Sequence, residues 1–171
     1  DPDGNTLLHE NGPEFVYTPS ATFLLHTRHA SDIPATSACL SLGYNGPEHM
    51  RLRFAEAEAR SVGRLMAGVT LAGSMDKKQI LYQSAMRHRL LHISCHGDFN
   101  PDSPLDSPLY LAPDELLTAQ DVFESLRLRC DLVTLSACMS GLSRVRRGDE
   151  LIGLARAFMY AGARAVIATL W

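Results

Sequence analysis

The chain has 171 residues, of which 46% are apolar and 20% are charged, and this is enough for one domain with its own hydrophobic core. Its longest apolar stretches are far shorter than the roughly 20 residues of a membrane-spanning helix, so a membrane-embedded protein is excluded. A net charge of -3 argues against a broadly basic surface that would bind nucleic acid.

The spacing of the cysteines bears on the compartment of the protein, and the chain ends bear on whether the chain is a fragment. No two cysteines are spaced as a CxxC pair, which favours a reduced, cytoplasmic protein over a disulfide framework. The chain begins without methionine and stops at Trp171, inside a predicted strand. We therefore interpret it as a fragment that lacks N-terminal and C-terminal parts of a longer protein.

Short apolar runs alternate with helical patterns along the chain. We predict strands at residues 14–17, 38–43, 69–73, 90–95, 108–111, 131–137 and 164–170. We predict helices at residues 20–29, 53–67, 76–87, 118–126 and 149–161. Asp76 and Thr118 are expected to cap two of these helices, and Gly162 to end the last one. This alternation is typical of an α/β fold with a mostly parallel sheet.

The predicted helix at 53–67 is amphipathic. Its apolar face is expected to consist of Phe54, Ala57, Val62 and Leu65. Its charged residues are interpreted as a solvated surface and comprise Glu56, Glu58, Arg60 and Arg64.

Two apolar runs each end in a chemically reactive side chain. Residues 90–95 lead to His96 and Gly97, and residues 132–137 lead to Cys138. Because ligands and chemistry collect at the carboxyl ends of strands in open α/β sheets, the imidazole and the thiol are expected at the same edge if the strands are neighbours. Cysteine attacks as a thiolate and histidine supplies the base, so this arrangement predicts a nucleophilic pair. The backbone N–H groups of Gly97 and Cys138 are candidate oxyanion donors.

Other interpretations remain open at this stage. Either residue alone could be a buried structural side chain, as free cysteines often are. A zinc site built from Cys95, His96 and Cys138 has suitable ligand types but lacks a second spaced pair. A nucleotide-binding domain is disfavoured because neither a GxxxxGK[ST] loop nor a GxGxxG turn follows a strand.

Beyond these patterns, the sequence resembles the CHAT domain, a family of caspase-like cysteine peptidases related to caspases and separases. The resemblance is dense from about residue 90 to residue 171 and looser upstream, where residues 17–20 and 55–66 look like family landmarks. It is carried by LHISCHGDF at 91–99, SPLYL at 107–111, LTA at 117–119, DLVTLSAC at 131–138 and GDELIGLARAFMYAGAR at 148–164.

The resemblance implies a caspase-hemoglobinase-like three-layer α/β sandwich with a mostly parallel central sheet, truncated at its C-terminus, and a single peptidase domain over residues 1–171. It makes His96 and Cys138 the catalytic dyad, with the backbone of Gly97 beside the oxyanion. It implies no metal and no organic cofactor, and a protein or peptide as substrate. Family members commonly follow tetratricopeptide or other repeats that sense a partner. The sequence departs from the family after the cysteine, where MSGLS at 139–143 replaces a threonine-glycine run.

Acidic residues near the candidate edge could select a basic residue in the substrate. Asp98 and Asp149 are the candidates, although Asp149 also suits the first turn of a helix. Asp131 is expected to begin its strand at the opposite edge from Cys138.

The sequence thus predicts a cytoplasmic cysteine endopeptidase that binds neither nucleic acid nor membrane. The alternative is a catalytically silent caspase-like module that transmits signals, because a fold does not guarantee chemistry.

Overall fold

The computed structural model describes residues 37–73, 76–100, 102–139 and 150–169, together with Leu25. The chain divides into two units, residues 1–32 and 33–171, and all the elements with defined bounds lie in the second. The predicted strand at 14–17 falls outside the described residues, as does the predicted helix at 20–29 apart from Leu25, which is helical.

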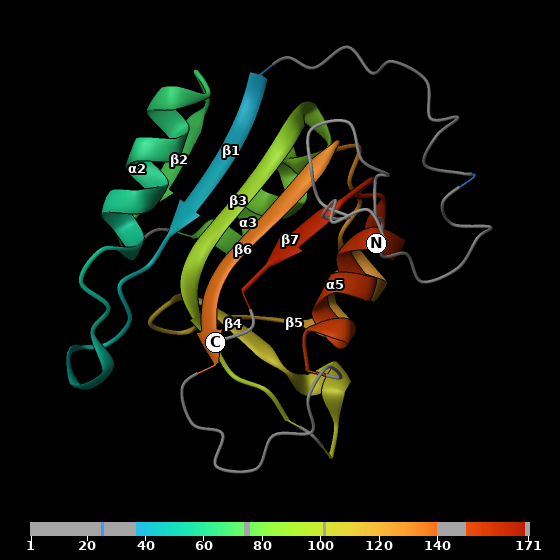
Figure 1. Cartoon of the computed structure of the whole chain (residues 1–171). Coiled ribbons are helices and arrows are strands. Elements are labelled where there is room, and N and C mark those ends of the chain that lie inside the picture. The colour runs from blue at the N-terminus through green and yellow to red at the C-terminus, as the bar shows by residue number, and fades with distance from the viewer. Residues whose placement is uncertain (1–24, 26–36, 74–75, 101, 140–149, 170–171) are drawn as a thin grey trace, which may run out of the picture. The chain divides into compact units, whose positions relative to one another are not determined.

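Among the residues just given, seven strands form one mixed sheet (Figure 1). They are β1 (Ser37–Gly43), β2 (Val69–Ala72), β3 (His88–Gly97), β4 (Pro108–Ala112), β5 (Glu115–Thr118), β6 (Leu132–Met139) and β7 (Val166–Ala168). β2, β1, β3, β6 and β7 pair in parallel in this order, whereas β4 pairs antiparallel with the end of β3 and with β5. The expectation of a mostly parallel sheet is corrected accordingly: β5 was not predicted, and its two-residue turn after β4 makes an antiparallel hairpin.

In the described part of the chain, four α-helices with defined bounds accompany the sheet. They are α2 (Ala55–Leu65), α3 (Lys77–Ser84), α4 (Ala119–Ser125) and α5 (Glu150–Ala161). The predicted helix ends are confirmed. Asp76 accepts a hydrogen bond from the Gln79 N–H at 3.1 Å, Thr118 forms a capping box with Asp121, and Gly162 follows α5 at φ +119°. No helix in the described part of the chain is long and apolar enough to cross a membrane.

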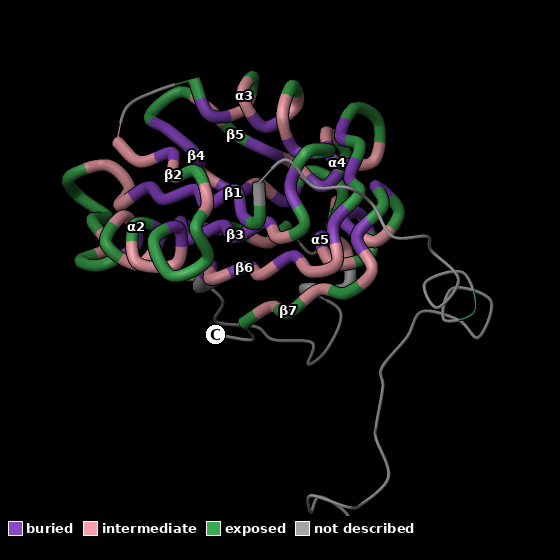
Figure 2. Tube along the Cα trace, turned by 90° about the horizontal axis from the view of Figure 1, so that it is seen from above, coloured by how far each residue is buried: buried purple, intermediate pink, exposed green. Residues whose placement is uncertain are grey.

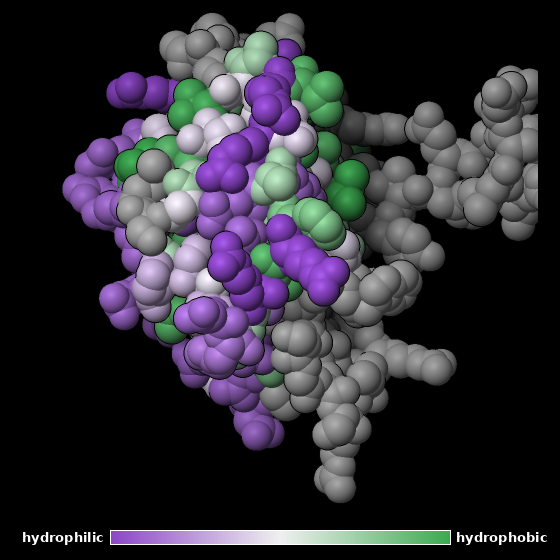
Figure 3. All heavy atoms as spheres, turned by 90° about the vertical axis from the view of Figure 1, so that its left-hand side faces the viewer, coloured by the Kyte–Doolittle hydropathy of each residue, from purple (hydrophilic) through white to green (hydrophobic). Residues whose placement is uncertain are grey.

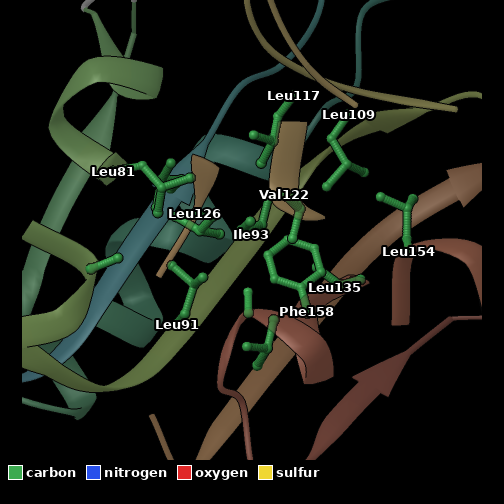
Figure 4. Close-up of a cluster of buried hydrophobic side chains, with 14 of the residues drawn as sticks. Leu81, Leu91, Ile93, Leu109, Leu117, Val122, Leu126, Leu135, Leu154 and Phe158 are labelled. Carbon is green, nitrogen blue, oxygen red and sulfur yellow. The ribbon is translucent and has the colours of Figure 1, made fainter. Parts of the chain in front are cut away.

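Figure 2 shows that the central strands β1 and β3 are largely buried. One face of the sheet carries the hydrophobic core (Figure 4). Side chains alternate along β3 and β6, so Leu91, Ile93 and Leu135 all point to this face. The helices that cover it contribute buried side chains of their own, Leu81 from α3, Val122 from α4 and Phe158 from α5. The polar residues at the alternate positions of both strands therefore lie on the other face.

Helix α2 lies on that second face and packs on β1 through small residues. Ala55, Ala59 and Gly63 are its buried positions, whereas Phe54 is 71% exposed and Leu65 is 83% exposed. The predicted apolar face of this helix is therefore wrong. Figure 3 shows this side of the molecule, where hydrophobic and hydrophilic side chains lie intermixed.

Close approach explains why α2 buries small side chains. A Cβ at Gly63 would lie 2.0 Å from Thr70 Oγ1, and one at Gly43 would lie 2.7 Å from the Ala59 Cβ. The Ser41 hydroxyl also donates a hydrogen bond to the Ala59 carbonyl at 2.8 Å. The helix is thus seated within hydrogen-bond distance of β1, where large side chains have no room.

Replacing Gly43 with alanine is expected to destabilise the protein by about 1–3 kcal/mol, because the added methyl group overpacks this contact. The added methyl carbon would lie 2.8 Å from the Glu56 Cα, so the backbone of the helix or the strand must move. Urea unfolding measures the change. Gly153→Ala in α5 is the control: its nearest contact would be 3.4 Å, and alanine favours a helix by up to about 1 kcal/mol over glycine. Equal stability of the two variants would contradict this account of α2 packing.

Candidate active site

Two neighbouring parallel strands place the predicted dyad. β3 and β6 pair along eight register positions, and His96 is the Cα partner of Cys138. The next pair is Gly97 with Met139. Adjacent strands lie about 4.8 Å apart, so the backbones of the two candidate residues are neighbours at the carboxyl edge of the sheet. The condition for placing both residues at one edge, that their strands are neighbours, is therefore met.

The His96 imidazole is held by the loop between β1 and α2. His96 is 6% exposed, and its Nε2 contacts the carbonyl oxygen of Met50. A carbonyl only accepts hydrogen bonds, so Nε2 carries the hydrogen and donates it. Nδ1 is then unprotonated in the neutral ring, and it is buried without a hydrogen-bond partner among the described residues. This tautomer leaves one ring nitrogen available as a base.

Gly46 makes room for that ring. Its φ is +83°, a conformation that favours glycine. A Cβ at this position would lie 2.5 Å from His96 Cδ2 and 2.9 Å from His96 Nε2. The loop is closed by Asn45, whose carbonyl accepts from the Leu52 N–H at 2.6 Å and whose side chain accepts from the Glu56 N–H at 3.0 Å. The loop that contacts His96 is therefore hydrogen-bonded to the first turn of α2.

The contacts of Met50 and Gly46 with His96 were not predicted from the sequence, which indicated only the pair His96 and Cys138. A main-chain carbonyl has no residue signature, since every residue carries one. Gly46 offered a weak signal, because glycine is common wherever a backbone approaches another group closely.

Gly97 ends β3 in a tight environment. It pairs with Leu109 of β4, and a Cβ on it would lie 3.2 Å from Leu109 Cδ2 and 3.3 Å from the Ala137 Cβ. Packing alone thus favours a glycine at this position. The expected oxyanion role of Gly97 and of the Cys138 backbone stays a prediction.

The acidic candidates lie in different places. Asp98 is exposed directly after β3, and its N–H donates to the Pro108 carbonyl at 3.0 Å. Asp149 falls outside the described residues. Asp131 precedes β6 at the end opposite Cys138, as expected, and it pairs with Arg89 and with Arg164, the latter at 3.2 Å.

The other cysteines are buried thiols. Burial raises the pKa of Cys95 and that of Cys130 to about 12 and raises the pKa of Cys39 as well. None of these three is a thiolate at neutral pH. Cys95 belongs to the hydrophobic core, on the opposite face of β3 from its neighbour His96. The alternative zinc site loses this ligand for that reason, and no cluster of three or more His, Cys, Asp or Glu suited to a metal ion occurs among the described residues.

A polar network lies beneath the candidate pair, between the sheet and α2. Glu58 Oε2 accepts hydrogen bonds from the hydroxyls of Ser94 at 2.9 Å and Ser136 at 3.2 Å. His92 Nε2 lies 3.5 Å from Glu58 Oε1, and His92 Nδ1 lies 2.6 Å from Thr134 Oγ1. The Glu58 side chain is 40% exposed, as expected of a solvated surface, but its carboxylate also reaches residues from both central strands.

Stability is expected to fall as the pH drops below about 6.5, the ordinary pKa of histidine. Burial lowers the pKa of His92, opposed by the Glu58 carboxylate, and burial with the charge of Arg87 lowers the pKa of His88. Below pH 6.5 the unfolded chain therefore binds more protons than the folded chain, so the free energy of unfolding decreases with decreasing pH. Urea midpoints between pH 7.5 and 5.5 measure this slope.

The control for this pH dependence is His49, which is exposed. His88→Gln is expected to flatten the slope of stability against pH, whereas His49→Gln should leave it unchanged. A slope unaffected by His88→Gln and by His92→Gln would show that other groups cause the acid destabilisation.

A separate hollow of about 330 Å³ lies beside α3 and the turn between β4 and β5. None of the predicted site residues lines it. One of its acidic groups, Glu115, accepts hydrogen bonds from the Lys77 N–H at 2.9 Å and the Lys78 N–H at 3.4 Å. This carboxylate is therefore engaged in holding the start of α3.

Comparison with known proteins places the sequence in a family. No curated protein gives a significant match to the chain. A model of the CHAT domain matches residues 1–171. This family is caspase-like, which agrees with the mixed α/β architecture and with strands that bring a histidine and a cysteine into register. The chain belongs to the CHAT domain family.

Proposed function

We propose that the protein is a cysteine endopeptidase that cleaves a protein target through His96 and Cys138. The observation that carries this proposal is the register pairing of these two residues on adjacent parallel strands. It is supported by the contact between His96 Nε2 and the Met50 carbonyl, which leaves Nδ1 unprotonated. The finer fold assignment, a caspase-hemoglobinase-like three-layer sandwich, belongs to the same proposal.

The reaction is acyl transfer in two steps. Nδ1 of His96 takes the Cys138 proton, and the thiolate attacks the peptide carbonyl to form a C–S bond. The backbone N–H groups of Gly97 and Cys138 stabilise the oxyanion. His96 then donates its proton to the leaving amine as the C–N bond breaks. In the second step His96 activates a water, which cleaves the thioester and regenerates the thiol.

Met50 contributes to this chemistry through its carbonyl. After His96 has taken the thiol proton, the Met50 carbonyl still accepts from the Nε2–H of the imidazolium. A charged ring beside the thiol lowers the thiol pKa, because the thiolate is stabilised by the positive charge. The same contact fixes the orientation of the ring.

The substrate is a protein or peptide, and Asp98 and Asp149 are proposed to favour a basic residue before the scissile bond. In the full-length parent, a repeat region of the tetratricopeptide type is proposed to control the site. The compartment proposed is the cytoplasm. A specificity panel without preference for Arg or Lys would remove the role of the two aspartates.

Activity-based labelling tests the proposed function. The protein is treated with a library of peptide acyloxymethyl ketones, which alkylate an active cysteine, and the modified residue is mapped by mass spectrometry. Labelling at Cys138 that is lost in Cys138→Ala and retained in Cys130→Ala would support the peptidase. Cys130 is a matched control because it is a buried thiol. Absence of labelling with candidate activators present would favour a catalytically silent signalling module.

A further inference from the structure

Glu58 is the one side chain of α2 shown to hydrogen-bond to both strands of the candidate dyad within the described part of the chain. The two hydroxyls that it accepts from belong to Ser94 of β3 and Ser136 of β6, which are register partners. Each serine lies two residues before a member of the pair His96 and Cys138. Because side chains two apart on a strand share a face, the carboxylate sits on the His96 face of the sheet.

The Glu58 side chain is 40% exposed and that of Glu56 is 18% exposed, so the hydrogen-bond partners of Glu58, and not its burial, distinguish it. Ser94 is 2% exposed, so its hydroxyl donates into the interface between the sheet and the helix. The other carboxylate oxygen lies 3.5 Å from Nε2 of the buried His92. By contrast, Glu56 of the same helix pairs with Arg60 one turn on, at 3.0 Å. The two hydrogen bonds from Ser94 and Ser136 to the Glu58 carboxylate therefore fasten α2 to the sheet.

Fastening α2 also fixes the loop that precedes it. Asn45 of this loop caps the Glu56 N–H at 3.0 Å, and the Met50 carbonyl of the same loop contacts His96 Nε2. A shift of α2 away from the sheet therefore moves the acceptor that sets the tautomer and the orientation of His96. The Asn45 side chain thus links the loop to the first turn of α2.

We propose that Glu58 is a positioning residue for the dyad. Its carboxylate docks α2 on β3 and β6 and thereby keeps the Met50 carbonyl on His96. The expected effect of Glu58 on catalysis rests on the proposed function. Its expected effect on the orientation of the His96 ring does not. Glu58 does not touch the reacting atoms in this scheme, so its loss affects the rate of the chemical step and leaves substrate binding unchanged.

The test compares Glu58→Ala and Glu58→Gln with Glu56→Ala, a matched loss of a carboxylate from the same helix. The first readout is the tautomer of His96, measured by ¹⁵N NMR on histidine-labelled protein and assigned with His96→Gln. Wild type and Glu56→Ala are expected to show the Nε2–H form. Glu58→Ala should show a mixture of tautomers, and Glu58→Gln, which keeps an acceptor oxygen, should lie nearer to wild type.

The second readout is cleavage of a fluorogenic peptide chosen from the labelling library. Glu58→Ala is expected to lower kcat by about 10-fold to 100-fold with KM unchanged, since a displacement of about 1 Å costs about 100-fold. Glu58→Gln should recover part of this loss. If Glu58→Ala fails to fold, Glu58→Gln and Ser136→Ala, which removes one donor, carry the same comparison with smaller expected changes.

The outcomes separate the two proposals. A wild type that neither labels nor cleaves, but whose His96 tautomer changes in Glu58→Ala, would overturn the peptidase and leave the docking role of Glu58 standing. An active wild type whose His96 tautomer and kcat are the same in Glu58→Ala and Glu56→Ala would overturn the positioning role. A fall in kcat in Glu58→Ala with an unchanged tautomer would also overturn it, because the proposed route runs through the His96 ring.

Discussion

His96→Ala is expected to lower kcat/KM for peptide cleavage by about a thousandfold, within the range of about 10²–10⁴ that a general acid–base contributes. The physical reason is that Cys138 loses both its proton acceptor and the positive charge that stabilises its thiolate. The rate of Cys138 alkylation by iodoacetamide at neutral pH should also fall, because the thiolate is the reacting form. Kinetic assays and peptide mapping of the alkylated protein measure the two effects.

His88→Gln serves as the control for this loss, because His88 begins the same strand at its opposite end. It should cleave the peptide at a rate close to that of wild type. If His96→Ala reacted as fast as wild type with iodoacetamide at neutral pH, Cys138 would have some other activating group, and the register pairing of the two residues would have no catalytic meaning.

The central strands could be predicted from the sequence because their pattern is local. Residues 90–95 and 132–137 are rich in leucine, isoleucine and valine, and each run has the length of a buried strand. The rule that chemistry collects at the carboxyl edge of such strands brought His96 and Cys138 together only if their strands are neighbours, and the register shows that they are.

The contacts that orient His96 could not be predicted in the same way, because they depend on how α2 sits. The hydrophobic pattern of this helix favours a face with Phe54 and Leu65, yet the helix buries Ala55, Ala59 and Gly63 instead. Close approach to a strand selects small side chains, and a pattern based on hydrophobicity alone gives them little weight. Once the helix is turned this way, Glu58 faces the sheet.

The antiparallel hairpin was missed for a related reason. β5 has four residues and follows β4 after the two-residue turn at Pro113 and Asp114. A run this short shows little alternation, so its pattern merges with that of the following helix. The hairpin matters for the site because β4 pairs with the end of β3 at Gly97.

Gly46→Ala is expected to lower kcat by about 100-fold, because it displaces the His96 ring from the Met50 carbonyl. The added methyl carbon would lie 2.5 Å from His96 Cδ2 and 2.9 Å from His96 Nε2, which is closer than real contacts allow. Either the ring turns away or the loop lifts, and a misplacement of about 1 Å in a catalytic group costs about 100-fold. Steady-state kinetics should show a fall in kcat, and ¹⁵N NMR should show the loss of the Nε2–H tautomer.

Gly73→Ala separates this clash from the cost of the backbone conformation. Gly73 has φ +80° and Gly46 has φ +83°, so alanine at either position loses about 1–2 kcal/mol of stability from the left-handed conformation. A Cβ at Gly73 would meet nothing within 4 Å, whereas one at Gly46 meets the imidazole. Gly73→Ala should therefore be less stable than wild type but fully active. Equal activity losses in the two variants would mean that general destabilisation, and not the position of His96, lowers the rate.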